Sequence, residues 1–303
     1  MSVNLSSLTP YVEENKSGLI KKSVYGAKSA SIFNLMTGVK GSTALNLLNT
    51  TVKFGNGLAC GWSEDTDTTQ AISQRNIVPG FIKVNTSFCD AAMTNYFMNN
   101  EVKVAAGTET LPFEEAFTSD IVANITTNLE KAIWYGDTDS TDVNLKQFDG
   151  LFKIITAASG STVNPVIGTG DTIDTVFNTV YTNIPVAILD KAVILCGADS
   201  FRTLVMALTA KNLVNYAPSV DGSMEIVLPG TSTKVIALNG MNGSKKIIAT
   251  YLDNIFYGTD LMGDEEVFKL WYSDDFQEFR LAVKFTAGVQ IAYLDMVVKA
   301  IHN

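Results

Sequence analysis

The residue types that most often carry out nucleophilic or acid–base chemistry are few in this 303-residue sequence. It has one histidine, His302, next to the end of the chain, whereas a Ser-His-Asp triad needs a histidine held firmly as the base. Its three cysteines, Cys60, Cys89 and Cys196, form no CxxC motif, and their odd number favours reduced thiols. We therefore interpret His302 as a solvent residue and the cysteines as ordinary, partly buried ones.

Two glycine-containing segments resemble phosphate-binding loops only in part. Residues 38–43, GVKGST, do not follow the GxxxxGK[ST] order, and no predicted strand precedes them. Residues 168–171, GTGD, lack the third glycine of a dinucleotide-binding loop. We predict a plain turn at the first segment and a helix-entry loop at the second.

Acidic residues gather in residues 137–142, DTDSTD, which begin like a calcium-binding loop. Such a loop needs glycine at its sixth position and glutamate at its twelfth, but here these are Asp142 and Phe148. An incidental cation stays an open alternative at this loop. The pairs Asp274-Asp275 and Glu265-Glu266 lie in predicted turns, where solvated charge is expected. We assign no catalytic, cofactor-binding or metal-binding residue and no cofactor, and we predict that the protein is not an enzyme.

Composition and charge narrow the class further. The net charge is −9 and the basic residues are not clustered, which argues against a dedicated nucleic-acid binder, although an acidic protein can still enclose DNA. Apolar residues at 46% fit a folded chain with an ample core. No apolar run approaches the roughly 20 residues of a membrane helix, and the first residues lack a secretion signal. We expect a soluble protein made in a cytoplasm.

The chain is organised around residues 112–135, which we predict to be one helix of about 36 Å. Pro112 suits its first turn, and Gly136 is predicted to end it in a left-handed conformation. Apolar residues recur at every fourth position, so an apolar band winds around the helix. These residues are Phe113, Phe117, Ile121, Ile125, Leu129 and Ile133, with Val122 and Ala132 beside them. The other side is small and polar: Thr118, Ser119, Thr126, Thr127 and Asn128.

Before this helix the chain is extended rather than compact. Residues 1–45 are interpreted as an arm with one or two short helices that must lie on something else. Residues 81–88 alternate as a strand, and we predict residues 47–54 as its partner in a long hairpin with a polar tip at 62–70. Residues 90–100 are predicted to form a short helix.

After the long helix, residues 151–250 have the pattern of an α/β unit. We predict helices over residues 173–184 and from residue 199 or 200 to 208, and a buried strand at 192–196. Further strands are predicted at 225–228, 234–238 and 246–250. The β-rich tail has predicted strands at 267–272, 279–285 and 289–299, with turns at 273–275 and 287–288. These patterns together predict a discontinuous domain, in which the long helix and the tail flank an inserted unit.

This order of parts, with four local motifs, resembles the major capsid protein of tailed bacteriophages, the Hong Kong 97-type fold. Trp62-Ser63-Glu64 resembles the W-x-E segment of the family's extended loop. Residues 129–137 followed by 148–151 resemble its segment of helix end, Gly-Asp, short loop and Gly-Leu. Residues 190–210 resemble a strand–helix element of its axial domain, and 276–299 its closing strands, with Ala287-Gly288-Val289 at the turn.

The resemblance implies an α+β fold of five parts. These are an N-terminal arm (1–45), an extended hairpin loop with a short helix (46–98), a peripheral domain with the spine helix (99–150), an axial α/β domain (151–250) and a β-rich return to the peripheral domain (251–303). It implies that the arm and hairpin are stabilised by neighbouring subunits. No charged helical segment opens the chain, so a built-in scaffolding domain is not expected, and no segment matches the Lys–Asn crosslink of some members.

As function, the resemblance implies a shell subunit that self-assembles into hexamers and pentamers and encloses DNA without sequence-specific binding. Separate scaffolding and portal proteins are the further implied partners, with no membrane. The implied location is the virion capsid, after synthesis in the bacterial host cytoplasm. Two alternatives stay open: an encapsulin-like compartment shell around a cargo enzyme, and an unrelated α/β enzyme or small-ligand-binding protein.

Overall fold

The computed structural model describes residues 8–54, 69–89, 113–158, 160–211, 224–260 and 267–302. Its α-helices are α1 (Leu8–Tyr25), α2 (Lys28–Ile32), α4 (Phe113–Tyr135), α5 (Leu151–Ala157), α6 (Ile173–Thr182) and α7 (Ala198–Ala210). Its strands are β1 (Asn34–Thr37), β2 (Thr43–Thr51), β3 (Thr69–Ile77), β4 (Gly80–Cys89), β5 (Ala192–Gly197), β6 (Glu225–Val227), β7 (Lys234–Leu238), β8 (Lys246–Tyr251), β9 (Ile255–Thr259), β10 (Val267–Ser273), β11 (Glu278–Ile291) and β12 (Val298–Ile301).

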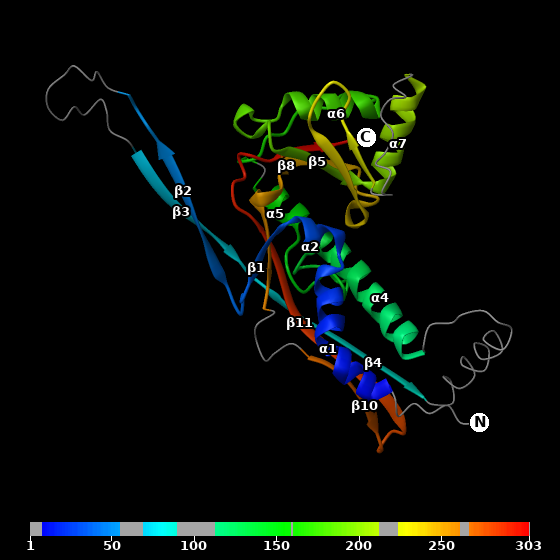
Figure 1. Cartoon of the computed structure of the whole chain (residues 1–303). Helices are drawn as coiled ribbons and strands as arrows, with labels where there is room; N and C mark the ends of the chain where they lie inside the picture. Colours follow the sequence, from blue (N-terminus) through cyan, green and yellow to red (C-terminus); the bar gives the residue numbers. More distant parts are fainter. Residues whose placement is uncertain are drawn as a thin grey trace.

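The described residues form three sheets (Figure 1). A long sheet has the order β1-β9-β11-β10, with β4 also paired to β11. A second five-stranded sheet has the order β12-β8-β5-β7-β6 and lies with α6 and α7 at the other end of the molecule. The third is the two-stranded β2–β3 hairpin, which projects away from the body. The described part of the chain therefore has two packed units and one protruding arm.

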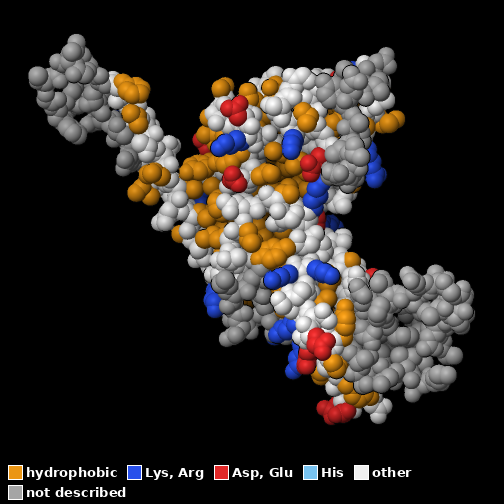
Figure 2. Space-filling model, in the orientation of Figure 1, with side chains coloured by type: hydrophobic (Ala, Val, Ile, Leu, Met, Phe, Trp, Pro, Cys, Tyr) orange, Lys and Arg blue, Asp and Glu red, His pale blue; other side chains and the backbone are white. Residues whose placement is uncertain are grey.

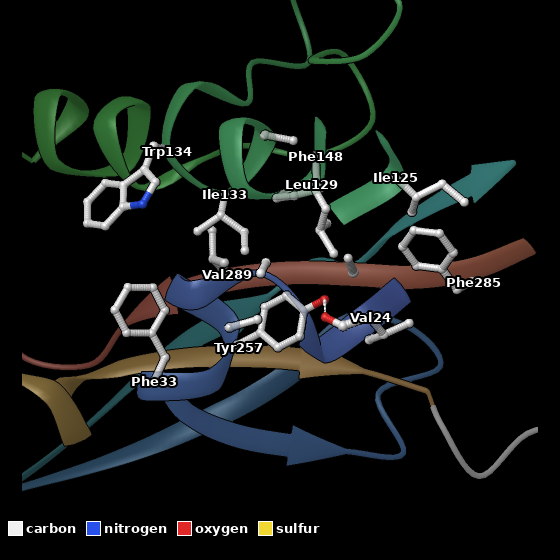
Figure 3. Packing of buried hydrophobic residues seen from close by; sticks show 14 of the residues in the cluster. Val24, Phe33, Ile125, Leu129, Ile133, Trp134, Phe148, Tyr257, Phe285 and Val289 are labelled. Carbon is white, nitrogen blue, oxygen red and sulfur yellow. Dashed lines mark hydrogen bonds between the residues drawn. The ribbon is translucent and has the colours of Figure 1, made fainter. Parts of the chain in front are cut away.

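Helix α4 confirms the predicted long helix. Its apolar band lies in the main core, where Ile125, Leu129 and Ile133 face strands of the long sheet (Figure 3). Trp134, outside the predicted band, is fully buried as well, with its ring 5.9 Å from that of Phe33. A band that winds around a helix needs partners on more than one side, and here the partners are the long sheet, α1 and the loop after α4.

The predicted left-handed end at Gly136 is wrong, because Gly136 is not among the glycines with positive φ. The residue is glycine for a different reason, which is the close approach of another segment. A Cβ on Gly136 would lie 2.5 Å from the carbonyl oxygen of Phe148, and one on Gly150 would lie 2.5 Å from the amide nitrogen of Gly136. The Gly150 N–H donates to the Gly136 carbonyl at 2.8 Å. The two glycines of the Gly-Asp and Gly-Leu motif thus mark one backbone crossing.

The N-terminal arm is more helical than predicted and packs on its own chain. The 18-residue helix α1 lies along α4 and β10 and adds Val12 and Val24 to the main core. The described part of residues 1–45 therefore lies on its own chain, and the stabilisation of this arm by neighbouring subunits stays a prediction. The first turn of α2 is fixed by buried polar contacts, in which Glu130 accepts from the N–H and the Oγ–H of Ser29 at 2.9 and 2.6 Å. Trp134 Nε1 donates to the same Ser29 Oγ at 2.8 Å.

The projecting hairpin exists, but its predicted pairing is wrong. Strand β2 pairs antiparallel with β3, which begins inside the segment predicted as the polar tip. The strand predicted at 81–88 is β4, and it pairs with β11 instead, from Gly80 opposite Ala287 to Cys89 opposite Glu278. β3 was missed because Gln70, Ser73 and Gln74 make it polar, although its neighbours Thr69 and Ile72 favour a strand.

The C-terminal tail is also rearranged. The predicted turn at residues 287–288 lies inside β11, which continues to Ile291, so the strands predicted on either side of it are one. Gly288 is required there because a Cβ would lie 2.9 Å from the Cα of Pro79. The predicted strand at 289–299 is divided, and its last part, β12, pairs with β8 in the second sheet. β9, missed in the sequence, completes the long sheet.

In residues 151–250 the predicted elements are confirmed in order: α6, β5, α7, β6, β7 and β8, with the extra helix α5 at the start. β5 is buried along its whole length, as expected for a central strand. The helix predicted at 90–100, Pro112 and Trp62-Ser63-Glu64 lie outside the described residues. The bounds of the five predicted parts stay a prediction.

Candidate assembly surfaces

The contacts of His302 and Cys196 fit a structural role rather than a chemical one. The His302 N–H donates to the Lys245 carbonyl oxygen at 2.9 Å, after the end of β12. Cys196 is a free, buried thiol of β5, and burial raises its pKa, which is the opposite of what a nucleophilic thiolate needs. Cys60 and the side chain of Cys89 lie outside the described part of the chain. Neither His302 nor Cys196 therefore forms part of a reactive constellation.

The two glycine segments are the turn and the loop that were predicted. Gly38 adopts a φ of 75°, and residues 38–43 lead into strand β2 rather than into a helix, so no helix N-terminus faces a phosphate there. At residues 168–171 the Asp171 carboxylate accepts from the Gly168 N–H at 2.6 Å, and Gly170 has a φ of 98°. This loop closes on itself just before α6.

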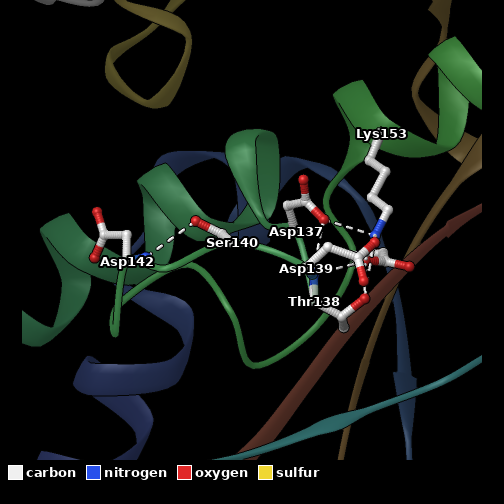
Figure 4. Close-up of polar contacts among 7 residues, drawn as sticks. Asp137, Thr138, Asp139, Ser140, Asp142 and Lys153 are labelled. Carbon is white, nitrogen blue, oxygen red and sulfur yellow. Dashed lines mark hydrogen bonds and ion pairs between the residues drawn. The ribbon is translucent and has the colours of Figure 1, made fainter.

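The acidic loop at 137–142 already holds a cation from its own chain (Figure 4). The Lys153 ammonium of α5 lies 2.6 Å from Asp137, 2.8 Å from Asp139 and 2.9 Å from Asp149. It also donates to the Thr138 hydroxyl at 3.1 Å. Because these oxygens bind the Lys153 ammonium, the loop acts as an ion-paired clasp between the end of α4 and α5.

The contacts within the clasp shift the pKa values of its members. The hydrogen bond from Lys153, followed by that from the Asp139 N–H, lowers the pKa of Asp137. Burial acts to raise the pKa of Asp149, but hydrogen bonds from Thr138 and Lys153 outweigh it and the pKa is lowered. Hydrogen bonds to Asp137, Asp139 and Asp149 raise the pKa of Lys153. The clasp therefore favours the charged forms of Asp137, Asp149 and Lys153.

Within the described ranges no group of three or more His, Cys, Asp or Glu side chains could hold a metal ion. None of the described helices is long and apolar enough to cross a membrane. The features that stand out are instead unpartnered surfaces.

The β2–β3 hairpin carries the clearest of them. Leu48 and Ile72 are directly opposite each other in the ladder and are 57% and 75% exposed. Val52, at the outer end of the hairpin, is 58% exposed. Figure 2 shows hydrophobic side chains along the projecting arm as far as its described end. A two-stranded ribbon is marginal alone, so an apolar cross-strand pair on it needs a partner. Sequence reasoning missed this pair because it gave β2 the wrong partner strand.

The base of the hairpin has a small core and a polar hinge. Val39, Leu45 and Ile77 form a separate buried cluster there. Gln290 of β11 accepts from Arg75 Nη2 at 2.9 Å and donates to the Asn76 carbonyl at 2.6 Å. Burial lowers the pKa of Arg75. One glutamine side chain therefore connects the arm to the long sheet.

A second unpartnered surface is a groove of about 390 Å³ between α4 and the outer edge of β4. Its lining includes the apolar side chains of Ile82, Val84 and Ile121 and carboxamides such as those of Asn124 and Asn128. Part of the small polar side of α4 thus lines this groove. Another part contacts α1, where Thr126 Oγ1 donates to the Lys22 carbonyl at 3.4 Å.

Comparisons with known proteins give matches in structure alone. No protein-family model and no curated protein sequence matches the chain. The Satellite phage P4 procapsid with its size determination protein aligns with a TM-score of 0.62 at 9% identity, over 94% of this chain and 90% of that one. The capsid of Ralstonia phage GP4 aligns with a TM-score of 0.53 at 8% identity, over 90% and 87%.

A third similar structure is a virus-like particle from Pyrococcus furiosus. Its TM-score is 0.53 at 8% identity, over 95% of this chain and 98% of that one. At such low sequence identities these alignments show a shared fold alone. The roles of individual residues are therefore argued from their contacts in this structure. The shared fold extends over nearly the whole length of each chain.

Proposed function

We propose that this chain, which has the fold of the phage capsid proteins, is the structural subunit of an icosahedral phage or prophage shell. In this proposal the fold is the Hong Kong 97 type, α4 is its spine helix, and residues 151–250 are an axial unit inserted into a peripheral domain. The subunit forms hexamers and pentamers through ring-closing contacts. It has no catalytic role.

The observation that carries the proposal is the β2–β3 hairpin. It projects from the body, exposes the Leu48–Ile72 pair and has only a small core at its base. A monomeric protein gains nothing from an exposed apolar arm of this kind, because such a ribbon invites aggregation. If a second copy of the chain covers the arm, its exposed apolar side chains become buried in an assembly contact.

The implied partners and location follow from the same proposal. The shell encloses DNA without sequence-specific contacts, which agrees with a net charge of −9. Scaffolding and portal proteins are separate chains, and the protein resides in the virion capsid after synthesis in the host cytoplasm. The second candidate is an encapsulin-like compartment, which is favoured by the full-length similarity to the Pyrococcus virus-like particle.

Electron microscopy of concentrated protein tests the proposal, with expected closed shells or rings of five and six subunits. Nuclease-protected DNA inside the particles supports a phage shell, whereas a co-purified enzyme supports the compartment. A persistent monomer whose melting temperature rises with a small ligand would favour the α/β enzyme or binding protein instead.

The double variant L48S/I72S tests whether the hairpin carries the assembly. Both side chains are exposed, so the free energy of unfolding should change by no more than about 0.5 kcal/mol, whereas particle yield should fall at least about tenfold. N46S/Q74S is the matched control, because this exposed polar pair lies one step along the same face of the ladder. If L48S/I72S formed normal particles, the exposed Leu48–Ile72 pair would be excluded as part of the assembly contact.

A further inference from the structure

Two of the chain segments that connect the long sheet to the second sheet carry the same three residue types in the same order. Tyr251-Leu252-Asp253 leads from β8 to β9, and Tyr293-Leu294-Asp295 leads from β11 back to β12. The buried Asn254 joins the two segments, because its side chain accepts from the Tyr293 N–H at 2.7 Å and donates to the Tyr293 carbonyl at 2.8 Å. The two segments therefore lie side by side, and together with Met296 they are called the double connection below.

The double connection exposes apolar surface across the junction of the two packed units. Leu252 and Leu294 are half-buried against the main core, whereas Tyr251 and Met296 are half-buried against the core of the second unit. Figure 2 shows hydrophobic side chains gathered there, between the base of the projecting arm and the second unit. Apolar side chains that gather on a surface in this way mark a contact site more often than scattered ones do.

The same surface is acidic, and its carboxylates lack a cation. Asp253 and Asp295 are exposed, and neither takes part in an ion pair with any other described residue. Burial raises the pKa of Tyr251, and electrostatic repulsion from Tyr293, Asp295 and Asp253 raises it further, so these four polar groups are neighbours. A cation that approached the double connection would therefore meet carboxylates and aromatic rings together.

Helix α7 has an exposed face of the opposite charge. Arg202 and Met206 lie one turn apart on it, both are exposed, and the Met206 side chain is 71% exposed. Among the described residues Arg202 forms no ion pair. The carboxylate of Asp199, one turn before Arg202, instead accepts from the N–H groups of Ser200 at 2.8 Å and Gly243 at 2.9 Å. Methionine and arginine are enriched in protein–protein contacts, so this face of α7 has the composition of a docking surface.

The two surfaces are complementary, but they cannot meet within one subunit. In Figure 1 the double connection lies at the edge of the body from which the hairpin leaves, and α7 lies at the opposite edge. A guanidinium binds a carboxylate through two parallel hydrogen bonds and also stacks on tyrosine rings. A methionine sulfur packs favourably against aromatic rings. The charge and the apolar area of one edge thus match those of the other edge of a second copy.

We propose that Arg202 and Met206 of α7 dock on the double connection of a neighbouring copy. In this contact Arg202 pairs with Asp295, and Met206 packs against the tyrosine rings. The inference rests on the proposed function and names residues of the subunit bodies that would join copies within its rings. Two different surfaces of identical chains meet, so successive copies repeat the same contact until the ring closes.

Photocrosslinking from α7 tests the contact directly. Full-length protein with p-benzoylphenylalanine in place of Met206 is mixed with an excess of ¹⁵N-labelled wild type at assembly concentration, irradiated and digested for mass spectrometry. We expect crosslinks to ¹⁵N peptides that contain residues 251–253 or 293–296. The control places the same photoreactive residue at Val143, which is 66% exposed in the loop after α4 and should give no such peptides. Crosslinks from position 206 only to other peptides, or to a different protein, would overturn the proposal.

A charge exchange supplies the second arm of the test. R202E and D295R should each lower the yield of particles or rings at least about tenfold, because like charges then face each other across the contact. R202E/D295R restores an ion pair of opposite polarity and should recover about half of the wild-type yield or more. K146E is the control for R202E, since it makes the same change of charge at an exposed lysine outside both surfaces. Thermal melts check that each variant folds.

The outcomes separate this contact from the shell function. If wild-type particles form and R202E assembles as well as K146E does, the shell stands and α7 is not its contact. If R202E/D295R assembles no better than the single variants, the two residues do not face each other, which also contradicts the proposal. If the wild type forms no closed particle but position 206 still crosslinks to residues 293–296 of a second copy, the contact stands and the shell function fails.

Discussion

At the scale of single residues, the most informative position is Lys153. In the sequence Asp137, Asp139 and Asp142 only begin like a calcium-binding loop, and an incidental cation stayed an open alternative. In the structure the ammonium of Lys153, eleven residues beyond Asp142, lies against Asp137 and Asp139. Asp142 itself takes no part, because its carboxylate accepts from the Asn144 N–H at 2.9 Å. The spacing of the carboxylates alone could not distinguish a bound metal ion from a lysine ammonium of the same chain.

The clasp predicts a pH dependence whose sign follows from its pKa shifts. The carboxyls of Asp137 and Asp149 have lowered pKa values in the folded state, so their contribution is present above the unfolded pKa near 4 and is lost as the pH falls through the folded values. Lys153 has a raised pKa, so its contribution is complete below about 10.5 and is lost only above that.

We therefore expect Lys153→Met to lower stability between pH 5 and 9 by a small amount, since the clasp is largely exposed. The variant should lose less stability than the wild type when the pH falls from about 5 to about 3. Urea unfolding at these pH values measures both effects. Lys146→Met, an exposed lysine of the same loop, is the control, and equal acid sensitivity of both variants and the wild type would contradict the assignment.

At the scale of elements, glycine contacts decide how α4 is joined to its surroundings. Gly136 and Gly150 bring the end of α4 and the start of α5 into backbone contact, and a Cβ on Gly240 would lie 2.3 Å from the carbonyl oxygen of Glu130. α4 is thus approached closely on two sides, by the loop to α5 and by the 3-10 helix Asn239–Met241 of the second unit. Side chains larger than hydrogen cannot fit at these points.

Gly150→Ala should therefore be strongly destabilising. The new methyl would lie 2.5 Å from the Gly136 nitrogen and 2.9 Å from the Ala132 oxygen, and backbone atoms can move only with the whole crossing. We expect a loss of about 1–3 kcal/mol in the free energy of unfolding. Gly160→Ala is the matched control, because a Cβ added there would meet nothing within 4 Å and the expected change is within about 0.5 kcal/mol. Equal effects in thermal melts would rule out the steric argument.

At the scale of the whole molecule, the hairpin and the body are connected by few contacts. Besides the cluster at its base, the described arm is held by Gln290 and by the Tyr293 hydroxyl, which donates to the Leu48 carbonyl at 3.4 Å. A projecting arm with so small a hinge can change direction at low energetic cost. This freedom suits the proposed shell subunit, which would have to fit rings of five and of six.

Gln290→Ala should loosen the hinge without unfolding the subunit. It removes the acceptor of Arg75 and the donor to Asn76, which is worth about 1–2 kcal/mol for two hydrogen bonds. Hydrogen exchange should become faster at Asn76 and Ile77 but stay unchanged in α4. Gln74→Ala, which removes a hydrogen bond to Asn46 within the arm, is the control. Unchanged exchange at the base in Gln290→Ala would show that the apolar cluster alone fixes the arm.

Elements with local signals could be predicted without any tertiary information. α4, α6, α7 and β5 were predicted from apolar spacing, because the period of a helix or a buried strand is set by neighbours a few residues apart. The motif of Gly136 and Gly150 was also visible, although its reason was not. Local chemistry likewise excluded His302 as a triad base.

Strand partners and open surfaces, in contrast, depend on how distant parts of the chain pack. An alternating strand shows which face is apolar but does not identify its partner, so β4 could equally have paired with β2 as with β11, almost 200 residues away. The exposed Leu48–Ile72 pair follows from such a register. Exposed surfaces of this kind are made by long-range strand pairing, and that is why local patterns could not reveal them.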